Sequence, residues 1–384
     1  MNFEFATATR IVFGAGTINQ VGVSAKSLGR RALVVTGRDA RRAEKLLASL
    51  AASGLGTATF AVAGEPEIST VEHGVASAQK EGCDVVIAFG GGSVIDAGKA
   101  IAAMLANDGE LLDYLEIIGR GKTLAKPSVP FIAIPTTAGT GTEVTRNAVL
   151  ASPEHQVKVS LRSPFLLARS AVIDPELTAD LPPALTASTG LDALTQLIEP
   201  FVCLRANPMT DGFCIEGIQR VARSLRAAVF NGQNKAARED MALASLFGGL
   251  SLANAGLGAV HGFAGPIGGG FPAPHGAVCA ALLPPVMAAN LRALRERAPQ
   301  NPALARYQKI AALLTGAPHA DAEAGVEWVQ KLVADLPVLR LREYGLREEH
   351  VGDLVKKTAA ASSMKANPVT LTPDELAQTL RLAL

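Results

Sequence analysis

The stretch DVVIAFGGGSVIDAGKA, residues 84–100, decides the fold class. Its first half is a short apolar run, typical of a strand buried on both faces, and its second half opens a helix directly after three glycines. Similar apolar runs occur along the first half of the chain, separated by Ala- and Leu-rich helical stretches. This alternation predicts a parallel, doubly wound α/β sheet. The strand candidates are ALVVT (32–36), TATFAV (57–62), DVVIAF (84–89), FIAI (131–134), QVKVSL (156–161) and AVIDP (171–175).

The second half of the chain has a different pattern. After residue 175 the β-like runs stop, and long Ala/Leu-rich segments predict helices, with a capping-type start at Ser188-Thr189-Gly190. A chain of 384 residues with 48% apolar residues exceeds what one hydrophobic core usually holds. We therefore expect an α/β domain over residues 1–180 and an all-α domain over residues 181–384, with a small-molecule site between them.

Charge and composition exclude several classes of protein. Lys plus Arg (36) nearly balance Asp plus Glu (35), so no strong field attracts nucleic acid or an anionic membrane surface. The N-terminus lacks the pattern of a secretory signal, and no apolar run is judged long enough to span a membrane. The four cysteines show no CxxC spacing, which indicates neither a disulfide framework nor a thiolate zinc site. We expect a cytoplasmic protein that acts on a small molecule.

Two loops are candidates for binding phosphate. Gly90-Gly91-Gly92-Ser93 follows a strand and opens a helix, where free backbone N–H groups and the helix dipole attract an anion. A second loop, Pro135 to Glu143, concentrates threonines and glycines after the next strand, although a tight turn or a plain loop would also fit each sequence. The usual GxGxxG fingerprint is absent after the first strand, and Gly14-Ala15-Gly16 is interpreted as a turn.

A third group of residues suits a metal ion. Asp192 and Gln196 lie four residues apart, so both side chains fall on one face of a helix. His261 and His275 lie far downstream in the sequence. One carboxylate and two imidazoles suit zinc or iron, although two histidines fourteen residues apart are also common as ordinary core or surface residues.

Four motifs taken together carry a family resemblance. They are GGGSVIDAGKA, PTTAGTGTEVT, STGLDALTQLIEP and NAGLGAVHGFAGPIGGGFPAPHGAVCAALLP. In this order and spacing, over almost the whole chain, they resemble the iron-containing (group III) alcohol dehydrogenase family. The resemblance implies a Rossmann-like N-terminal domain of the dehydroquinate synthase type, a helical C-terminal domain and hydride transfer between NAD(P)H and an alcohol/aldehyde or ketone pair.

The resemblance also implies roles for particular residues. The family's metal ligands, an aspartate and three histidines, fall on Asp192, Gln196, His261 and His275, so three match and one does not. Asp192, His261 and His275 are accordingly the expected catalytic residues, which hold an iron or zinc ion that polarises the substrate oxygen. The residues expected at the NAD(P) cofactor are Gly37, Gly91, Gly92, Ser93, Asp96, Thr136, Thr137, Thr140, Asn147 and Lys158.

Two departures from the family pattern indicate a divergent subgroup. Gln196 replaces a ligand histidine, and Gly265 stands where many members have a histidine that assists proton transfer. We expect weaker metal binding, and a proton supplied by solvent or by a cofactor hydroxyl.

Gly37 stands where NAD-preferring relatives often carry an aspartate for the ribose 2′-hydroxyl, and Arg38, Arg41 and Arg42 follow it. The sequence therefore predicts that NADP(H) is used at least as well as NAD(H).

Two other activities share this fold. A metal-independent reductase resembling maleylacetate reductase is one alternative, and a lyase resembling dehydroquinate synthase is another. A non-catalytic binding protein is a third possibility. By resemblance, we also expect a homo-oligomer.

Overall fold

The computed structural model describes residues 2–155 and 157–384. The chain divides into two compact units. The first, called the sheet unit below, comprises Ala6–Thr137 and Gly141–Thr178. The second, the helical unit, comprises Ala179–Leu384 together with Ala138–Thr140 and the N-terminal residues up to Phe5.

The sheet unit contains a six-stranded sheet in which every neighbouring pair is parallel, as predicted. The strands are β1 (Ile11–Phe13), β2 (Arg31–Thr36), β3 (Gly56–Ala61), β4 (Val85–Gly90), β5 (Phe131–Pro135) and β8 (Ser170–Ile173), in the spatial order β1-β8-β5-β4-β2-β3. The chain goes from β2 outward to β3 and then returns to place β4 on the other side of β2. This reversal creates a switch point between β2 and β4, where open α/β sheets bind ligands at the carboxyl ends of the strands.

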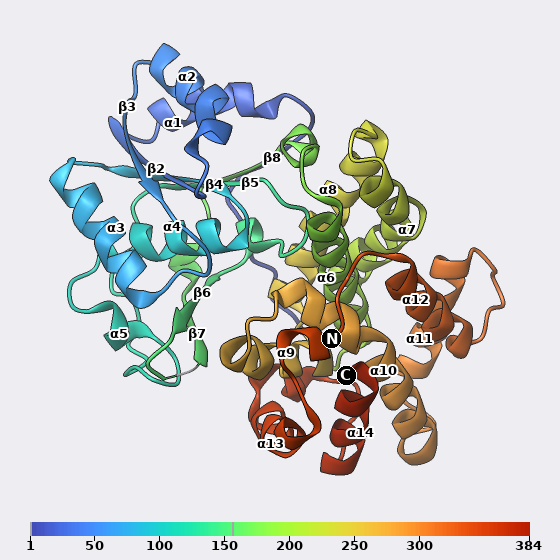
Figure 1. The fold of residues 1–384 in the computed structure, drawn as a ribbon. Helices are drawn as coiled ribbons and strands as arrows, with labels where there is room; N and C mark the ends of the chain where they lie inside the picture. Colours follow the sequence, from blue (N-terminus) through green and yellow to red (C-terminus); the bar gives the residue numbers. More distant parts are fainter. Residues whose placement is uncertain (1, 156) are drawn as a thin grey trace. The chain divides into compact units, whose positions relative to one another are not determined.

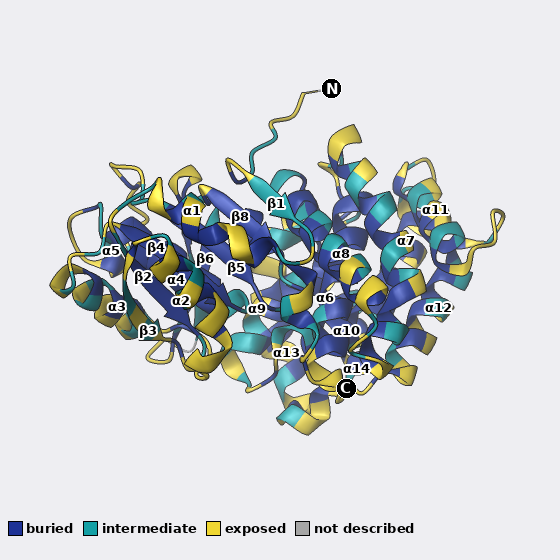
Figure 2. Cartoon of the chain, turned by 90° about the horizontal axis from the view of Figure 1, so that it is seen from above, coloured by how far each residue is buried: buried dark blue, intermediate teal, exposed yellow. Residues whose placement is uncertain are grey.

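Helices cover both faces of this sheet (Figure 1). They are α1 (Val21–Lys26), α2 (Glu44–Ala52), α3 (Ile68–Lys80), α4 (Gly92–Met104) and the short α5 (Leu111–Tyr114). All six residues of β4 are buried, because a parallel strand covered by helices on both sides has no solvent-facing side (Figure 2). This two-sided burial explains why β2, β4 and β5 appear in the sequence as continuous apolar runs.

Two strands form a separate antiparallel pair. They are β6 (Asn147–Ser152) and β7 (Val157–Arg162), in register from Asn147 opposite Arg162 to Ser152 opposite Val157. The candidate strand 156–161 therefore pairs outside the parallel sheet, and its first residue, Gln156, lies outside the described residues. The sequence analysis did not predict β1 or β6.

The helical unit is built from long helices, as predicted. They are α6 (Pro183–Val202), α7 (Pro208–Phe230), α8 (Lys235–Asn254), α9 (Ala259–Gly270), α10 (His275–Arg297), α11 (Ala303–Thr315), α12 (Ala322–Asp335), α13 (Val351–Ala360) and α14 (Pro373–Ala383). Short 3₁₀ helices also occur in the chain: Thr17–Gln20, Ala40–Ala43, Thr142–Val144, Pro164–Leu166, Pro175–Thr178, Leu341–Tyr344, Glu348–His350 and Ser362–Ala366.

The predicted helix start at Ser188-Thr189-Gly190 is wrong. Helix α6 begins at Pro183, because proline is tolerated in the first turn, where its missing N–H costs nothing. The Ser188 and Thr189 hydroxyls donate to the Leu185 carbonyl inside the helix, at 3.1 and 2.8 Å. Both hydroxyls are therefore satisfied inside the helix, and neither residue caps the N-terminus of α6.

Helix α10 contradicts the expectation that no apolar run is long enough to span a membrane. Among the described residues, α10 is long and apolar enough to cross a membrane, and α8 with α9 passes the same test only as a bent pair. However, 78% of the apolar window of α10 is buried inside the structure (Figure 2). Such burial is typical of a core helix, because its apolar residues pack against neighbouring helices.

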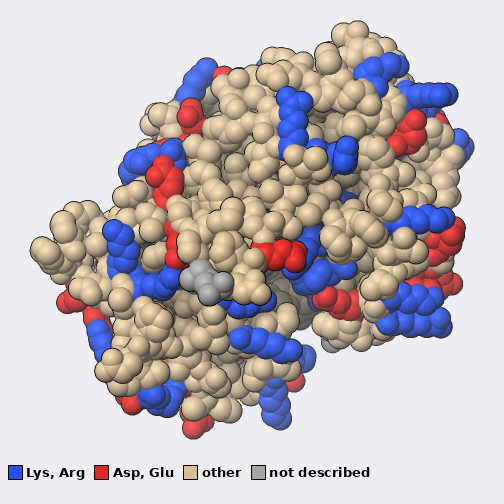
Figure 3. Space-filling model, turned by 180° about the vertical axis from the view of Figure 1, so that it is seen from behind, with Lys and Arg blue, Asp and Glu red and all other residues tan. Residues whose placement is uncertain are grey.

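Charged side chains of both signs are interspersed on the face shown in Figure 3. This distribution agrees with the formal net charge of +1.

Candidate active site

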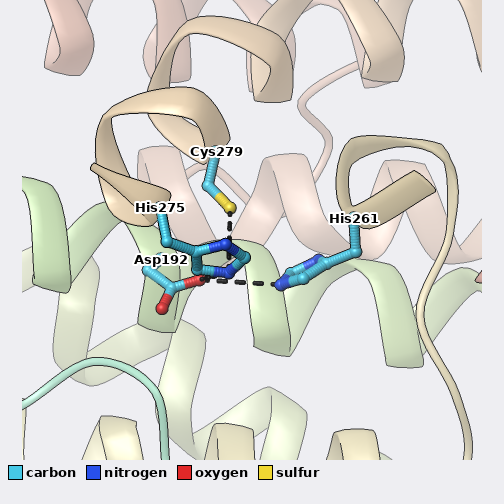
Figure 4. Close-up of side chains that lie close together, drawn as sticks. All are labelled: Asp192, His261, His275 and Cys279. Carbon is cyan, nitrogen blue, oxygen red and sulfur yellow. Dashed lines mark hydrogen bonds and ion pairs between the residues drawn. The ribbon is translucent and has the colours of Figure 1, made fainter. Parts of the chain in front are cut away.

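Four side chains of the helical unit converge on one point. They are Asp192 from α6, His261 from α9, and His275 and Cys279 from α10 (Figure 4). One potential metal-ligand atom from each of them lies within 4.8 Å of those from the others. We call this group the Asp/His/Cys cluster. The structure thus brings together three of the four predicted metal-ligand positions and adds a cysteine.

Helix α6 supplies a polar stripe inside an apolar core. Asp192, Gln196 and Glu199 follow one another at spacings of four and three residues, so they share one face of the helix. They are 1%, 2% and 4% exposed. Buried polar groups are costly unless they find partners, so this stripe marks the part of the core that is built to bind something.

Glycine allows α10 to approach α6 closely. A Cβ atom at Gly276 would lie 2.3 Å from the main-chain oxygen of Ser188, which no larger residue could accommodate without a shift. Because Gly276 directly follows His275, this close approach holds the His275 ring near Asp192. The His275 Nε2 and Asp192 Oδ1 atoms are 3.5 Å apart.

Glu199 fixes the orientation of His261. Its Oε1 accepts from the Val260 backbone N–H at 2.7 Å, and its Oε2 lies 2.6 Å from His261 Nδ1. A carboxylate can only accept, so in the neutral imidazole, the form that binds metals, Nδ1 carries the proton and Nε2 presents a lone pair toward the Asp/His/Cys cluster. A carboxylate that orients a metal-binding histidine in this way is a common partner of metal ligands in proteins.

Two atoms of the Asp/His/Cys cluster, Asp192 Oδ1 and His261 Nε2, are buried and have no hydrogen-bond partner among the described residues. The same holds for Gln196 Oε1, one turn further along α6. The Asp192 Oδ1 to His261 Nε2 distance is 3.6 Å, which is too long for a hydrogen bond. Carboxylate oxygen and imidazole nitrogen are ligands for zinc and iron, so these unsatisfied atoms fit a divalent cation.

The charges of the cluster are strongly coupled. Burial alone would raise the pKa of Asp192, but His275 and His261 beside it hold that pKa well below its usual range. Burial alone would lower the pKa of His261, but its contacts with the carboxylates of Asp192 and Glu199 raise it to about 9. The pocket therefore stabilises positive charge beside Asp192.

The predicted phosphate loops lie at the ends of neighbouring strands in the sheet unit. Helix α4 begins at Gly92, and no side chain caps its first turn, which leaves its N-terminal N–H groups available to an anion. The Thr136 N–H donates to the Gly90 carbonyl at 2.9 Å. A Cβ at Gly91 would be 3.4 Å from the Thr137 methyl. The structure thus brings Gly91, Gly92 and Ser93 together with Thr136 and Thr137.

Gly37 directly follows β2, the strand next to β4 across the switch point. Among the described residues, no atom would lie within 4 Å of a Cβ at Gly37. Of the arginines after it, Arg41 is paired with Asp39, at 2.8 and 3.0 Å.

Asp96 and Lys99 hold the end of the Thr-rich loop and the backbone beyond it. The carboxylate of Asp96 accepts from the Thr142 hydroxyl at 2.5 Å and from the Val149 N–H at 3.1 Å. Lys99 donates to the hydroxyls of Thr142 and Thr145 and to the Asn147 carbonyl, at 2.7, 2.9 and 2.8 Å. Both carboxylate oxygens of Asp96 are thus engaged, which favours a positioning role for this residue over direct cofactor contact.

Burial shifts the pKa values around Asp96. It lowers the pKa of Lys99 to about 8, raises that of Glu143 to about 7 and raises that of Asp96.

The remaining predicted residues are dispersed. Lys158 on β7 forms an ion pair with Glu65 at 3.3 Å. Thr140 belongs to the helical unit, whereas Thr136 and Thr137 belong to the sheet unit. Gly265 is exposed, and no atom of residues 2–155 or 157–384 lies within 4 Å of where its Cβ would be.

Sequence reasoning missed two residues of the site, and a local signal existed for both. Glu199 follows Asp192 by seven residues, which is two helical turns, and Cys279 follows His275 by four. Phe263, which the sequence could not assign to pocket or core, is fully buried in the helical core.

A parallel sheet with glycine-rich loops suited to an anion and a helical unit with a buried carboxylate–imidazole cluster are typical of metal-assisted, nucleotide-linked dehydrogenases. Comparison with known sequences identifies the family. Residues 8–175 match the model for iron-containing alcohol dehydrogenase, and residues 186–384 match that for the C-terminal part of the Fe-containing alcohol dehydrogenase family. The chain belongs to the iron-containing alcohol dehydrogenase family.

Individual relatives match over nearly the whole chain. The 1,3-propanediol dehydrogenase of Klebsiella pneumoniae is 36% identical, over 99% of this chain and 98% of the relative. The NAD-dependent methanol dehydrogenase of Bacillus methanolicus is 34% identical, over 97% of each chain. The crystal structure of a 1,3-propanediol oxidoreductase superposes with a TM-score of 0.93 at 34% identity and covers 100% of both chains.

These matches confirm the predicted activity class. The chain is an oxidoreductase that transfers hydride between NAD(P)H and an alcohol/aldehyde pair, and its family uses NAD(P) and iron or another divalent metal. They do not favour the maleylacetate reductase or dehydroquinate synthase alternatives.

Proposed function

We propose that this protein interconverts primary alcohols and their aldehydes, with the Asp/His/Cys cluster as its metal site and the loops after β2, β4 and β5 as its NAD(P) site. The observation that carries the proposal is the set of buried, unpartnered atoms Asp192 Oδ1, His261 Nε2 and Gln196 Oε1. The names of the relatives, a 1,3-propanediol, a methanol and a long-chain-alcohol dehydrogenase, support alcohol substrates.

In this proposal Asp192, His261 and His275 hold the ion. When bound, the ion supplies a Lewis acid that polarises the substrate oxygen. Glu199 keeps His261 in the tautomer that presents Nε2, and Asp192 supplies negative charge that offsets part of the charge of the ion. Gln196 contributes a neutral amide oxygen, a weaker donor than imidazole, as a weak ligand or as a group that orients water.

The first domain, residues 1–180, would bind the dinucleotide. The N–H groups at the start of α4, with Gly91, Gly92 and Ser93, are suited to the pyrophosphate, because no side chain caps them. Asp96 and Lys99 act indirectly, because they hold the end of the Thr-rich loop and the segment beyond it. The other residues proposed to contact NAD(P) or place its nicotinamide and the substrate are Gly37, Thr136, Thr137, Thr140, Asn147 and Lys158.

The second domain, residues 181–384, would bind the metal and the substrate. The exposed Gly265 offers no proton, so we assign the proton to solvent or to a cofactor hydroxyl. We also propose a cytoplasmic homo-oligomer that binds neither nucleic acid nor membrane. The near balance of charge supports this assignment, because it provides no strongly basic surface.

The test is NAD(P)H oxidation with a panel of short aldehydes, measured before and after chelation and after re-addition of zinc or ferrous iron. Activity should disappear with the metal, return with it and be lost in His275→Ala. His319→Ala, at an exposed position of the helical unit, is the matched control and should retain activity. Full activity in metal-free protein would refute the metal-assisted mechanism, and a cofactor that is regenerated without net consumption would indicate a lyase.

A further inference from the structure

Cys279 is the member of the Asp/His/Cys cluster that the family resemblance does not account for. It follows His275 by one helical turn on α10 and is 0% exposed. Its Sγ atom lies 3.7 Å from His275 Nε2 and faces the same point as Asp192 and His261 (Figure 4). Because the sulfur shares a helix face with a proposed ligand, it needs no rearrangement of α10 to approach an ion.

The separations within the cluster match those between ligands around one small ion. Zinc bonds of about 2.0–2.1 Å to oxygen or nitrogen, and about 2.3 Å to sulfur, place tetrahedral ligands about 3.3–3.6 Å apart. The structure has 3.5 and 3.6 Å between Asp192 Oδ1 and the two imidazole Nε2 atoms, and 3.7 Å from sulfur to His275 Nε2. The remaining pairs lie within 4.8 Å, so a small inward shift would close the shell.

A second, independent observation points to a ligand at the centre. The Asp192 Oδ1 and His261 Nε2 atoms, on side chains 2% and 7% exposed, have no hydrogen-bond partner within the described chain and are aimed into this space. The other buried cysteines, Cys203 and Cys214, belong to no such group among the described residues. Cys279 therefore differs from them in its neighbours and not in its burial.

We propose that the Cys279 thiolate is a metal ligand that compensates for Gln196, giving an Asp/His/His/Cys site that prefers zinc to iron. The proposal rests on the metal site of the proposed function and changes its ligand set. On binding, the S–H bond of Cys279 breaks, a metal–sulfur bond forms and the proton leaves to solvent. Thiolate is a soft ligand that favours zinc, and Gln196 then acts from outside the ligand set, where its amide can orient water.

The direct test is spectroscopic and does not depend on catalysis. The purified protein, stripped of metal and loaded with Co²⁺, should show a thiolate-to-cobalt charge-transfer band in the near ultraviolet. The zinc form should show a Zn–S distance of about 2.3 Å by X-ray absorption. Absence of sulfur from the metal shell of the wild-type protein, or failure of the apo-protein to bind either ion, would overturn the proposal.

Variants identify which sulfur is bound. Cys279→Ser should lose the charge-transfer band, and Cys279→Ala should weaken zinc binding by more than the roughly 10–100-fold that loss of an outer-shell partner costs. Cys203→Ala, a buried cysteine outside the cluster, should keep both properties. Gln196→His in the Cys279→Ala protein should restore much of the zinc affinity. Circular dichroism checks that each variant is folded, and an unchanged band in folded Cys279→Ser would contradict the assignment.

Metal choice gives a further readout. With equal zinc and ferrous iron, the wild-type protein should take up zinc, and this preference should shrink in Cys279→Ala. NAD(P)H-linked activity without metal–sulfur bonding would overturn this inference and leave the proposed function standing. Metal–sulfur bonding in a protein inactive toward every alcohol and aldehyde would do the reverse.

Discussion

Glu199→Gln is a nearly isosteric change that should alter the metal site through the tautomer of His261. The wild-type carboxylate accepts two buried N–H groups, from Val260 at 2.7 Å and from His261 Nδ1 at 2.6 Å. An amide has one oxygen and one NH₂ group, so it cannot accept at both positions. The backbone N–H of Val260 cannot reverse its role, whereas the imidazole can.

The variant should therefore place its oxygen on Val260 and its NH₂ group on His261 Nδ1. The imidazole proton then moves to Nε2, the atom that faces Asp192, and Nε2 loses its free lone pair. Losing an outer-shell partner of this kind costs about 10–100-fold in metal affinity. This corresponds to about 1.4–2.7 kcal/mol, because each tenfold change is about 1.4 kcal/mol.

The measurement is a competition between apo-protein and a chromophoric chelator for zinc. Asp240→Asn is the matched control, because Asp240 is a largely buried carboxylate of the helical unit whose partners are Arg220, Arg223 and Ser224. It should lower the free energy of unfolding without changing the zinc dissociation constant. An unchanged dissociation constant in folded Glu199→Gln would refute the idea that Glu199 controls the tautomer.

Three further predictions concern the sheet unit. Gly37→Asp, at a position with open space for a side chain, should shift preference from NADP(H) toward NAD(H), because the new carboxylate can accept from the ribose 2′-hydroxyl. A wild-type kcat/KM for NADH far above that for NADPH would contradict the prediction that NADP(H) is used at least as well as NAD(H). Gly92→Val should weaken NADPH binding in a folded protein, because a branched Cβ occupies the start of α4, and an unchanged dissociation constant would show that the loop is only a turn. For Glu143, burial raises the folded-state pKa from 4.5 to about 7, so its contribution to stability is fully present below pH 4.5 and is lost as the pH rises through about 7. At about 1.36 kcal/mol per pKa unit, urea unfolding of the wild type should show a loss of about 3 kcal/mol in the free energy of unfolding over this pH range. This loss should disappear in Glu143→Gln. If the two proteins showed the same dependence of stability on pH, Glu143 would not be its cause.

The sheet was predictable where its signals are local. Strand β4 and helix α4 adjoin in the sequence, and both faces of the strand are buried, so a continuous apolar run marked it. Strand β1 has only three residues, and β6 alternates between buried and half-buried positions beside a Thr-rich loop. Strand β1 is too short for an apolar run to identify it, and the run Ala148–Ala151 of β6 was missed although it is as long as the run that identified β5.

Helix periodicity predicts the part of the metal site that lies on α6. Asp192 and Gln196 are related by one turn of α6, and the same rule extended by another turn reaches Glu199. No local sequence rule predicts the contact between α6 and α10, because this contact depends on the close approach at Gly276. Cys279 stands one helical turn after His275, but its nearness to Asp192 follows from the packing of α10 against α6, so the sequence alone suggested an ordinary buried thiol.

The buried polar residues of α6 and the histidine beside them also explain how the protein can fold stably around this site before any ion binds. A carboxylate that is 1% exposed would be prohibitively costly alone, but Asp192 lies beside His261, whose pKa is raised to about 9, so a proton can stand in for the ion at neutral pH. The 3.6 Å separation shows that this substitute does not close a hydrogen bond. Without an ion, the charge of Asp192 is therefore compensated, but its Oδ1 atom and His261 Nε2 lack hydrogen-bond partners. A divalent cation can displace the proton and bond to both atoms.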